Sequence, residues 1–495
     1  MQQTSAPVRA GTPDTLRRAV PLWPLPALLT LAIGLWRIDG PSYWRDESVG
    51  VVAGHGSLSA LWAFLHEVDA VHGVYYAFLH LVTFFGTDEI TTRLPSVLAM
   101  AAASAGIAVL GRRLISPATG LYGGLLYGLL PITSRYAQEV RQYALVSAGA
   151  VLATYLLVRA LESDRPSPRW YLAYGACMGL LGWFHLYALF LLSAHLFALV
   201  ALPREKRLRH TLAWLLSVLL ALAMVLPLVL VARGQEGAQV SWLSAPPATA
   251  PYDFGLETTG SPLLLIVLVA LAVLGVIGNT GRNAVLLAAW PIAPLLTSIA
   301  ISLAHPVYHP RYVLYCVCGL ALAAGAGLEL LTRRLRYGQV AALAALTCAA
   351  ALTVPTQLAL REPHSRPDDL RSFSALLRQQ ARPGDAVVFI PAYREKFVTA
   401  YADAFTRLHS PGPTDLPLDR FRAFLDKESR IWVVEVPPPG HRYRSPLPRR
   451  DLKALQADKR FTHGGTQKFG GLTLTLYERR GPGRPAGSRP ARHIT

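Results

Sequence analysis

Residues 43–48 read Tyr43-Trp44-Arg45-Asp46-Glu47-Ser48, a charged stretch that follows an apolar run ending near Trp36. In an ordinary loop, Asp46 and Glu47 would complement the positive end of the helix that follows them. Several more polar and aromatic clusters fall on the same side of a membrane once the topology is derived from charge. The acidic pair is therefore a candidate functional site as well as a candidate helix start.

The long apolar runs decide the fold class. The 495 residues are 52% hydrophobic and 16% charged, whereas a soluble domain carries about 25% charged residues. Most runs reach the roughly 17–25 residues that cross a bilayer. The run 170–203 is long enough for two crossings, broken at 184–187. This predicts eleven spans, from the runs 21–36, 94–111, 120–134, 144–158, 170–203, 211–232, 261–280, 283–304, 312–328 and 339–360.

Charge predicts the orientation. With the N-terminus in the cytoplasm, the inner segments hold sixteen Lys and Arg, and the outer loops before residue 361 hold seven. This count requires residues 38–92 to form one outer loop, in which the short apolar segments 49–65 and 73–85 lie in the membrane interface. The alternative, a span at 73–85, would place the basic clusters 112–113 and 204–209 outside. The distribution of positive charge therefore favours the long outer loop.

The predicted organisation has four parts. Residues 1–18 form a cytoplasmic tail, with no cleavable signal peptide after it. Residues 19–360 form the membrane domain, and residues 361–478 a small extracytoplasmic α/β domain with a helix at 368–380 and strands at 386–390, 431–436 and 472–477. The basic, Pro- and Gly-rich tail 479–495 is predicted to be disordered. The formal charge of +18 comes mainly from this C-terminal part and from inner loops, so a nucleic-acid partner is not supported.

Four outer segments bring carboxylates, histidines, tyrosines and arginines to one side of the membrane. Carboxylates suit general-base work or metal binding, and arginine suits phosphate. Simpler readings stay open: aromatic residues can anchor in the interface, Glu139 and Arg141 can form a local ion pair, and Arg311 can contact lipid headgroups. The candidates are Asp46, Glu47, His72, Tyr75, Tyr76, Glu139, Arg141, His185, Tyr187, Arg311 and Tyr312, with Asp69 in the first outer segment.

The order of these motifs resembles a known family. The resemblance is carried over about residues 20–330 by Arg45-Asp46-Glu47, Asp69-x-x-His72-x-x-Tyr75-Tyr76, Phe85-Gly86, Arg93-Leu94-Pro95-Ser96, Glu139-x-Arg141-x-Tyr143-Ala144-Leu145 and Arg311-Tyr312. This set is similar to the GT-C glycosyltransferases, in the branch of the protein O-mannosyltransferases and the aminoarabinose transferase of lipid A. Relatives have Pro-Pro before the paired tyrosines, where this chain has Gly73-Val74.

The resemblance implies an all-α polytopic membrane enzyme that is an inverting glycosyltransferase. It would move a sugar, with mannose favoured, from a polyprenyl-phosphate donor to an acceptor on the outer face. Asp46 would accept or orient the acceptor's proton, and Arg311, helped by Arg141 or His72, would stabilise the phosphate. Glu47 and Glu139 would bind sugar hydroxyls or a divalent metal, for which Asp46 and Glu139 are the candidate ligands.

Two questions stay open at this stage. The acceptor could be a protein, a lipid, a glycan or a secreted small molecule. The rival function is a transporter or flippase of lipid-linked sugars, which would place ionisable groups near the bilayer midplane; here they lie at the outer ends of predicted spans.

The orientation can be tested without a substrate. In a background without native cysteines, single cysteines at positions 60 and 400 should react with a membrane-impermeant thiol reagent applied to intact cells. A cysteine at position 206 should react only after the membrane is opened. Labelling of position 206 but not 400 from outside would reverse the predicted topology.

Overall fold

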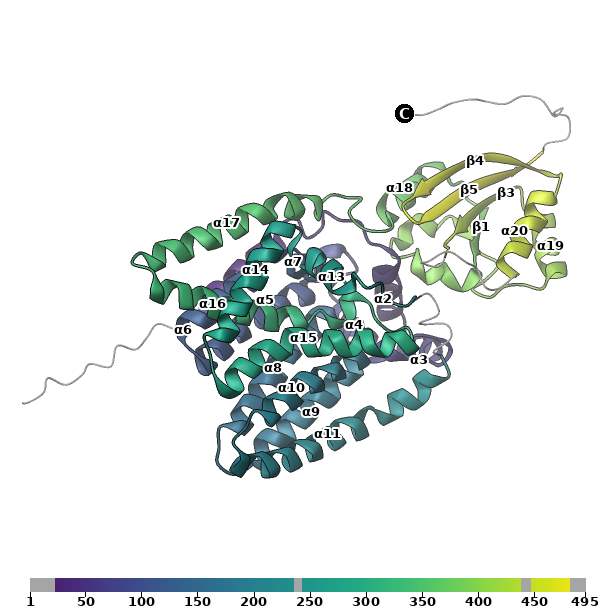
Figure 1. Cartoon of the computed structure of the whole chain (residues 1–495). Helices are drawn as coiled ribbons and strands as arrows, with labels where there is room; N and C mark the ends of the chain where they lie inside the picture. The colour runs from purple at the N-terminus through teal and green to yellow at the C-terminus, as the bar shows by residue number, and fades with distance from the viewer. Residues whose placement is uncertain (1–22, 236–242, 438–446, 481–495) are drawn as a thin grey trace, which may run out of the picture.

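Each predicted apolar run forms a helix in the computed structural model of the chain, which describes residues 23–235, 243–437 and 447–480. The helices form a bundle with a smaller α/β unit at one end (Figure 1). The bundle helices are α1 (Pro24–Leu35), α5 (Glu89–Leu114), α6 (Pro117–Leu129), α7 (Pro131–Ala137), α8 (Tyr143–Leu161), α9 (Pro168–Phe184), α10 (Leu191–Val200), α11 (Arg204–Arg233), α13 (Ala250–Thr259), α14 (Pro262–Ile277), α15 (Gly281–Ala304), α16 (Cys316–Arg334) and α17 (Gly338–Ala359), with the short 3₁₀ helices η2 (Leu186–Phe190) and η3 (Pro310–Val313).

The described residues include six helices long and apolar enough to cross a membrane: α5, α8, α11, α15, α16 and α17. A seventh span results if α13 and α14, which meet at a 102° bend, are counted as one. The other predicted spans correspond to the shorter helices α1, α6, α9 and α10. The polytopic helical fold is thus confirmed, and the number eleven stays a prediction.

Small side chains place α16 at the centre of the bundle. The helix is rich in Gly, Ala and Cys and packs against α6, α14 and α15. At Gly327 an added Cβ would overlap the carbonyl oxygen of Leu271 on α14, so glycine is required for this close approach. By contrast, α11 and α17 are largely exposed along their apolar faces, as expected for helices at a lipid-facing rim.

The first polar loop contains only short helices, and none of them is among the six long apolar helices. They are α2 (Arg45–His55), α3 (Leu58–Glu67), η1 (Ala70–His72) and α4 (Gly73–Val82). The 10 residues of α4 extend only about 15 Å, half of a hydrocarbon core. The predicted single segment 49–65 is wrong in one respect: the helix ends at His55, and Ser57 caps the next one by accepting a hydrogen bond from the Ala60 amide at 3.2 Å.

The C-terminal unit is a five-stranded sheet covered on both faces. Its elements are α18 (Leu370–Gln380), β1 (Asp385–Ile390), η4 (Ala392–Phe397), η5 (Ala402–Phe405), β2 (Leu408–His409), α19 (Leu418–Lys427), β3 (Arg430–Glu435), α20 (Leu447–Ala457), β4 (Phe461–Phe469) and β5 (Leu472–Arg479). The strand order is β2-β1-β3-β5-β4, with β1 parallel to β2 and β3, and β5 antiparallel to β3 and β4.

The predicted helix and three strands match α18, β1, β3 and β5. Alternation along the strands fills two cores: Val387 and Phe389 of β1 face α18, whereas Val388 and Ile390 face α19 and α20. The strand β4 and the helices α19 and α20 were missed. All seven β4 residues between Phe461 and Phe469 are polar or glycine, and the strand is largely exposed, so it lacks a strand pattern. The predicted tail beyond residue 480 lies outside the described residues.

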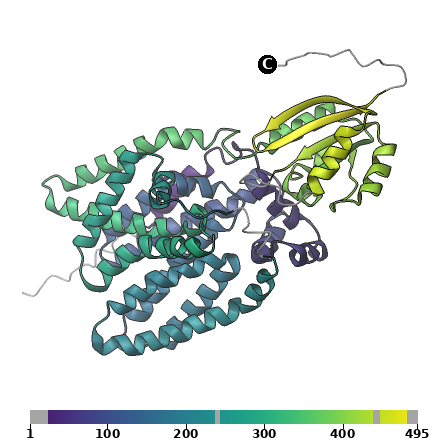
Figure 2. The same cartoon turned by 45° about the vertical axis from the view of Figure 1, so that its right-hand side comes forward.

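The C-terminal unit packs on the first polar loop. Both views place it at the end of the bundle that carries α2 and α3 (Figures 1 and 2). Tyr43, Val49 and Tyr76 from the loop share one buried apolar cluster with Phe373 and Trp432 from the C-terminal unit. Segments more than 300 residues apart in sequence therefore form a single core around the acidic stretch.

Candidate active site

The acidic stretch forms the first turn of α2. Trp44 is extended and precedes the helix, so Arg45, Asp46 and Glu47 occupy the turn where carboxylates complement the helix dipole. Arg45 is buried and donates to both oxygens of Asp368, from Nε at 2.7 Å and from Nη2 at 2.7 Å. The first turn is thereby attached to the C-terminal unit.

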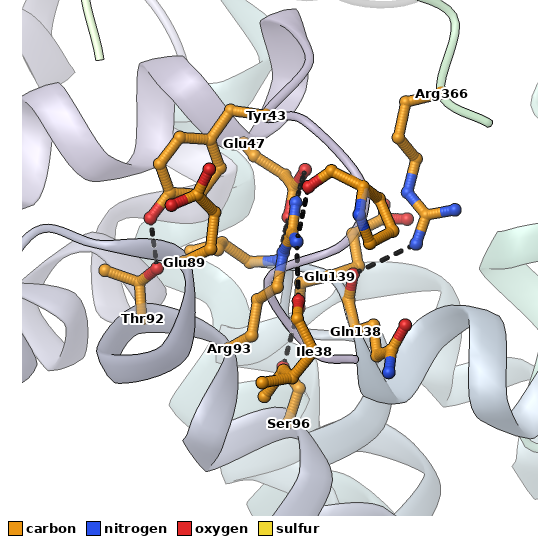
Figure 3. Close-up of polar contacts among 12 residues, drawn as sticks. Ile38, Tyr43, Glu47, Glu89, Thr92, Arg93, Ser96, Gln138, Glu139 and Arg366 are labelled. Atoms are coloured by element: carbon orange, nitrogen blue, oxygen red, sulfur yellow. Dashed lines mark hydrogen bonds and ion pairs between the residues drawn. The ribbon is translucent and has the colours of Figure 1, made fainter. Parts of the chain in front are cut away.

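On the other side of Asp46, Glu47 is fully buried against Arg93 of α5 (Figure 3). Arg93 donates from Nε and Nη2 to the two carboxylate oxygens, both at 2.9 Å, and the Val140 amide donates to Oε1 at 3.0 Å. The remaining Arg93 donors are used by the carbonyl oxygens of Ile38 at 2.8 Å and Ser42 at 3.2 Å. Glu47 has its oxygens occupied by these partners, which indicates a positioning role and not the predicted contact with sugar or metal.

Asp46 lies between Arg45 and Glu47 in the sequence, and its carboxylate contacts two arginines. Arg311 donates from Nη1 to Asp46 Oδ2 at 2.8 Å, and Nη2 of Arg141 lies 3.5 Å from the same oxygen. Burial raises the pKa of Asp46, but Arg141 and Arg311 outweigh this effect and lower the pKa to about 2. The carboxylate is therefore ionised at neutral pH and committed to the two guanidinium groups.

Both arginines are nearly enclosed by protein. Among the described residues, the buried Nε and Nη1 of Arg141 have no hydrogen-bond partner. The guanidinium of Arg311 lies over the rings of Trp44 and Tyr143, each 5.8 Å from the ring centroid, and of Tyr312 at 5.6 Å. Buried donors without partners are costly, and an anion is a group that could satisfy those of Arg141. The alternative of a local ion pair between Glu139 and Arg141 is not what the structure shows: Glu139 pairs with Arg135, and Arg141 faces Asp46.

The predicted ring-bearing residues of two outer segments, His185, Tyr187 and Tyr312, meet beside Arg311. His185 lies edge-on to Tyr312, with centroids 5.0 Å apart, and Tyr187 stacks on Tyr312 at 5.2 Å. Burial, with the charges of Arg311 and Arg141, lowers the pKa of His185 to about 3. His185 is thus a neutral ring within an aromatic cluster that could contact a sugar face or a lipid.

His72, Tyr75 and Tyr76 lie close enough to Arg141 for its charge to affect their titration. Burial, together with the charges of Arg141 and His185, lowers the pKa of His72 well below its ordinary value, and Nδ1 lies 2.9 Å from Nε2 of Gln142. His72 can therefore offer a neutral hydrogen bond to a phosphate, but not the cationic contact that a basic residue there would supply.

The predicted metal alternative does not fit these residues. Glu139 is buried and pairs with Arg135, while Asp46 is bracketed by two cations, which repel a divalent ion. Among the described residues, no group of three or more His, Cys, Asp or Glu is placed to hold a metal.

Sequence reasoning missed the partners that fix the site. Arg93 was noticed only as part of a motif, and Asp368 and Gln142 were not singled out. The signal for Arg93 was its position in the outer loop just before an apolar run, where an unpaired charge would be unfavourable. Nothing in the sequence connects Arg45 to Asp368, which lies 323 positions away.

Comparisons with known proteins agree with this architecture. The family described as "Dolichyl-phosphate-mannose-protein mannosyltransferase" matches residues 72–230, which include His72, Glu139, Arg141 and His185 but not Asp46. No curated protein matches the chain by sequence.

Solved structures show the fold. ArnT from Cupriavidus metallidurans in the apo state is 13% identical with a TM-score of 0.62, covering 91% of this chain and 97% of that chain. The oligosaccharyltransferase of Archaeoglobus fulgidus in the apo form is 10% identical, with a TM-score of 0.53 and coverage of 83% and 69%. The same archaeal enzyme, AglB, in complex with an inhibitory peptide and a dolichol-phosphate is 9% identical with a TM-score of 0.54, again covering 83% and 69%. The chain therefore has the GT-C glycosyltransferase fold.

The assignment of Glu47 to positioning yields a stability prediction. Glu47→Gln should lower the free energy of unfolding by about 3–5 kcal/mol, because it leaves Arg93 buried without a charged partner. Thermal unfolding of the purified protein in detergent measures the change. Glu205→Gln on the exposed first turn of α11 is the matched control. Equal melting temperatures for Glu47→Gln and the control would contradict the assignment.

Proposed function

We propose that this protein is an inverting glycosyltransferase that takes a sugar from a polyprenyl monophosphate and transfers it to an acceptor at the outer face of the membrane. The observation that carries the proposal is the enclosed pair Arg141 and Arg311 around one carboxylate, with Arg141 donors left without partners. A phosphodiester would satisfy those donors by charge-assisted hydrogen bonds. The GT-C fold and the structural similarity to the archaeal AglB in complex with a dolichol-phosphate support this donor class.

The reaction follows from the placement of these groups. The acceptor oxygen forms a bond to the anomeric carbon while the bond from that carbon to the phosphate oxygen breaks. The polyprenyl phosphate leaves with one more negative charge, which Arg141 and Arg311 stabilise, and the acceptor's proton passes to a carboxylate. Because attack and departure occur on opposite faces, the anomeric configuration inverts.

Mannose is the proposed sugar, and the family description over residues 72–230 supports it. The rings of Tyr187 and Tyr312 supply a surface for one face of a sugar or for the first isoprene unit. The acceptor is proposed only as a hydroxyl compound that reaches the outer end of the bundle.

Asp46 provides the first test of function. Asp46→Asn should reduce transfer from polyprenyl-phosphate mannose by about 100-fold or more, because it removes the charge that aligns both arginines. Transfer is measured with radiolabelled donor and the purified protein in liposomes, by counting labelled product and released sugar. Asp39→Asn, at an exposed position of the same loop, is the control and should retain wild-type rates. Full activity of Asp46→Asn would refute the site.

Arg311 tests the phosphate contact. Arg311→Lys should weaken activity and Arg311→Ala should nearly abolish it, since lysine keeps the charge but loses the planar fork. Donor affinity, measured by displacement of labelled donor, should fall in parallel. Arg233→Ala, at the exposed end of α11, serves as the control. Unchanged donor affinity in Arg311→Ala would assign this arginine to lipid headgroups instead.

A further inference from the structure

Asp69 adopts a strained conformation beside the proposed active site. Its backbone has φ +62° and ψ +24°, and Arg37 is the other non-glycine residue with positive φ among the described residues. Such conformations persist where surrounding contacts hold them, often at functional sites. Here Gln235, beyond α11, accepts a hydrogen bond from the Ala70 amide at 2.9 Å and donates to the Leu65 carbonyl at 2.8 Å. The turn is thus fixed by a residue from another part of the bundle.

The Asp69 side chain faces the same charges as Asp46. The Tyr76 hydroxyl donates to Oδ2 at 3.1 Å, and among the described residues no hydrogen bond reaches Oδ1. Arg141 and Asp46 are near enough for their charges to affect its titration. Asp69 therefore has one oxygen anchored by a buried phenol and the other available to a ligand.

The pKa values of Asp46 and Asp69 are shifted in opposite directions. Asp46 is held by Arg311 and Arg141 and is a weak proton acceptor, because its pKa is lowered to about 2. Burial raises the pKa of Asp69, and the Asp46 charge adds to this, against the lowering effects of Arg141 and Tyr76. When neighbouring titratable groups have their pKa values moved apart in this way, the pair commonly divides the acid–base work.

Resting on the proposed function, we propose that Asp69 receives the acceptor's proton, while Asp46 holds the two arginines in place for the leaving phosphate. In this step the acceptor hydroxyl oxygen bonds to the anomeric carbon, its proton moves to Asp69 Oδ1, and the polyprenyl phosphate departs as a dianion. Asp69 then releases the proton to solvent, so atoms and charge balance.

Other nearby groups are less suited to this role. The Glu47 carboxylate accepts hydrogen bonds from Arg93 and from the Val140 amide, and Glu139 forms an ion pair with Arg135. His72 is neutral but has its Nδ1 engaged by Gln142. Besides Tyr76, Arg141 and Asp46, the titratable groups nearest in sequence to Asp69 are Glu67, which is exposed, and then His66 and His72.

The test uses Asp69→Asn, which keeps the size of the side chain and tolerates the left-handed backbone. With radiolabelled polyprenyl-phosphate mannose in liposomes and water as the acceptor, mannose release should fall about 100-fold or more relative to wild type. Donor affinity should stay within about twofold, because Asp69 does not contact the phosphate. Asp69→Glu should recover part of the rate.

Azide distinguishes proton transfer from a structural effect. Azide attacks without losing a proton, so it should restore turnover of Asp69→Asn as mannosyl azide of inverted configuration, but should not restore Asp46→Asn. The wild-type rate with water should decline as the pH falls through the raised pKa of Asp69, and the rate with azide should lack this decline.

The outcomes separate the two proposals. An Asp69→Asn variant with wild-type mannose release, or one that binds donor but stays inactive with azide, overturns the role of Asp69 and leaves the glycosyltransferase proposal intact. A wild-type protein that forms neither mannose nor mannosyl azide from bound donor overturns the proposed function itself, and the role of Asp69 with it.

Discussion

The buried ion pair between Glu47 and Arg93 is the interaction on which the candidate site depends. Both side chains are fully enclosed, and the arginine donates to the carboxylate and to three carbonyl oxygens of the connection between α1 and α2. Burying two charges is expensive, so such a pair is worth most when every donor and acceptor is used, as here. The pair fixes α2 relative to α5 and, through the Val140 amide, relative to the second polar segment. Asp46 and Arg141 are held in reach of each other as a consequence.

The charged side chains of the site fall into two groups, which differ in whether all their hydrogen-bonding atoms have partners. In the first group are buried ion pairs in which the arginine donors meet carboxylate acceptors, such as Arg45 with Asp368 and Arg93 with Glu47. The guanidinium of Arg141 keeps buried donors without partners. A protein interior tolerates this arrangement only at some cost in stability, and a ligand of opposite charge removes that cost. If the protein binds the proposed phosphate donor, these unsatisfied donors point to its place more specifically than the number of arginines does.

Sequence reasoning predicted the elements built from repeating patterns. The apolar runs became helices, and β1, β3 and β5 were visible because their side chains alternate between two buried cores. It did not predict β4, whose exposed polar residues carry no such alternation. At the site, the order of motifs singled out Asp46, Arg141 and Arg311 as candidates, and the structure places their side chains in contact. It could not distinguish Asp46 from Glu47, because adjacent residues on a helix face different directions and their partners are distant in sequence.

The C-terminal unit is part of the same constraint. Arg45, the residue immediately before Asp46, forms an ion pair with Asp368. The loop helices and the sheet also share one apolar cluster. The first turn of α2 is consequently held from both sides, by α5 in the bundle and by residues that follow the last bundle helix. Solved structures that share this fold at 9–13% identity show that such an architecture survives extensive sequence change. Function resides in the site that the fold positions. In this chain that site is completed by contacts from the first polar loop, the bundle and the C-terminal unit together, so none of the three parts alone would hold Asp46 against its arginines.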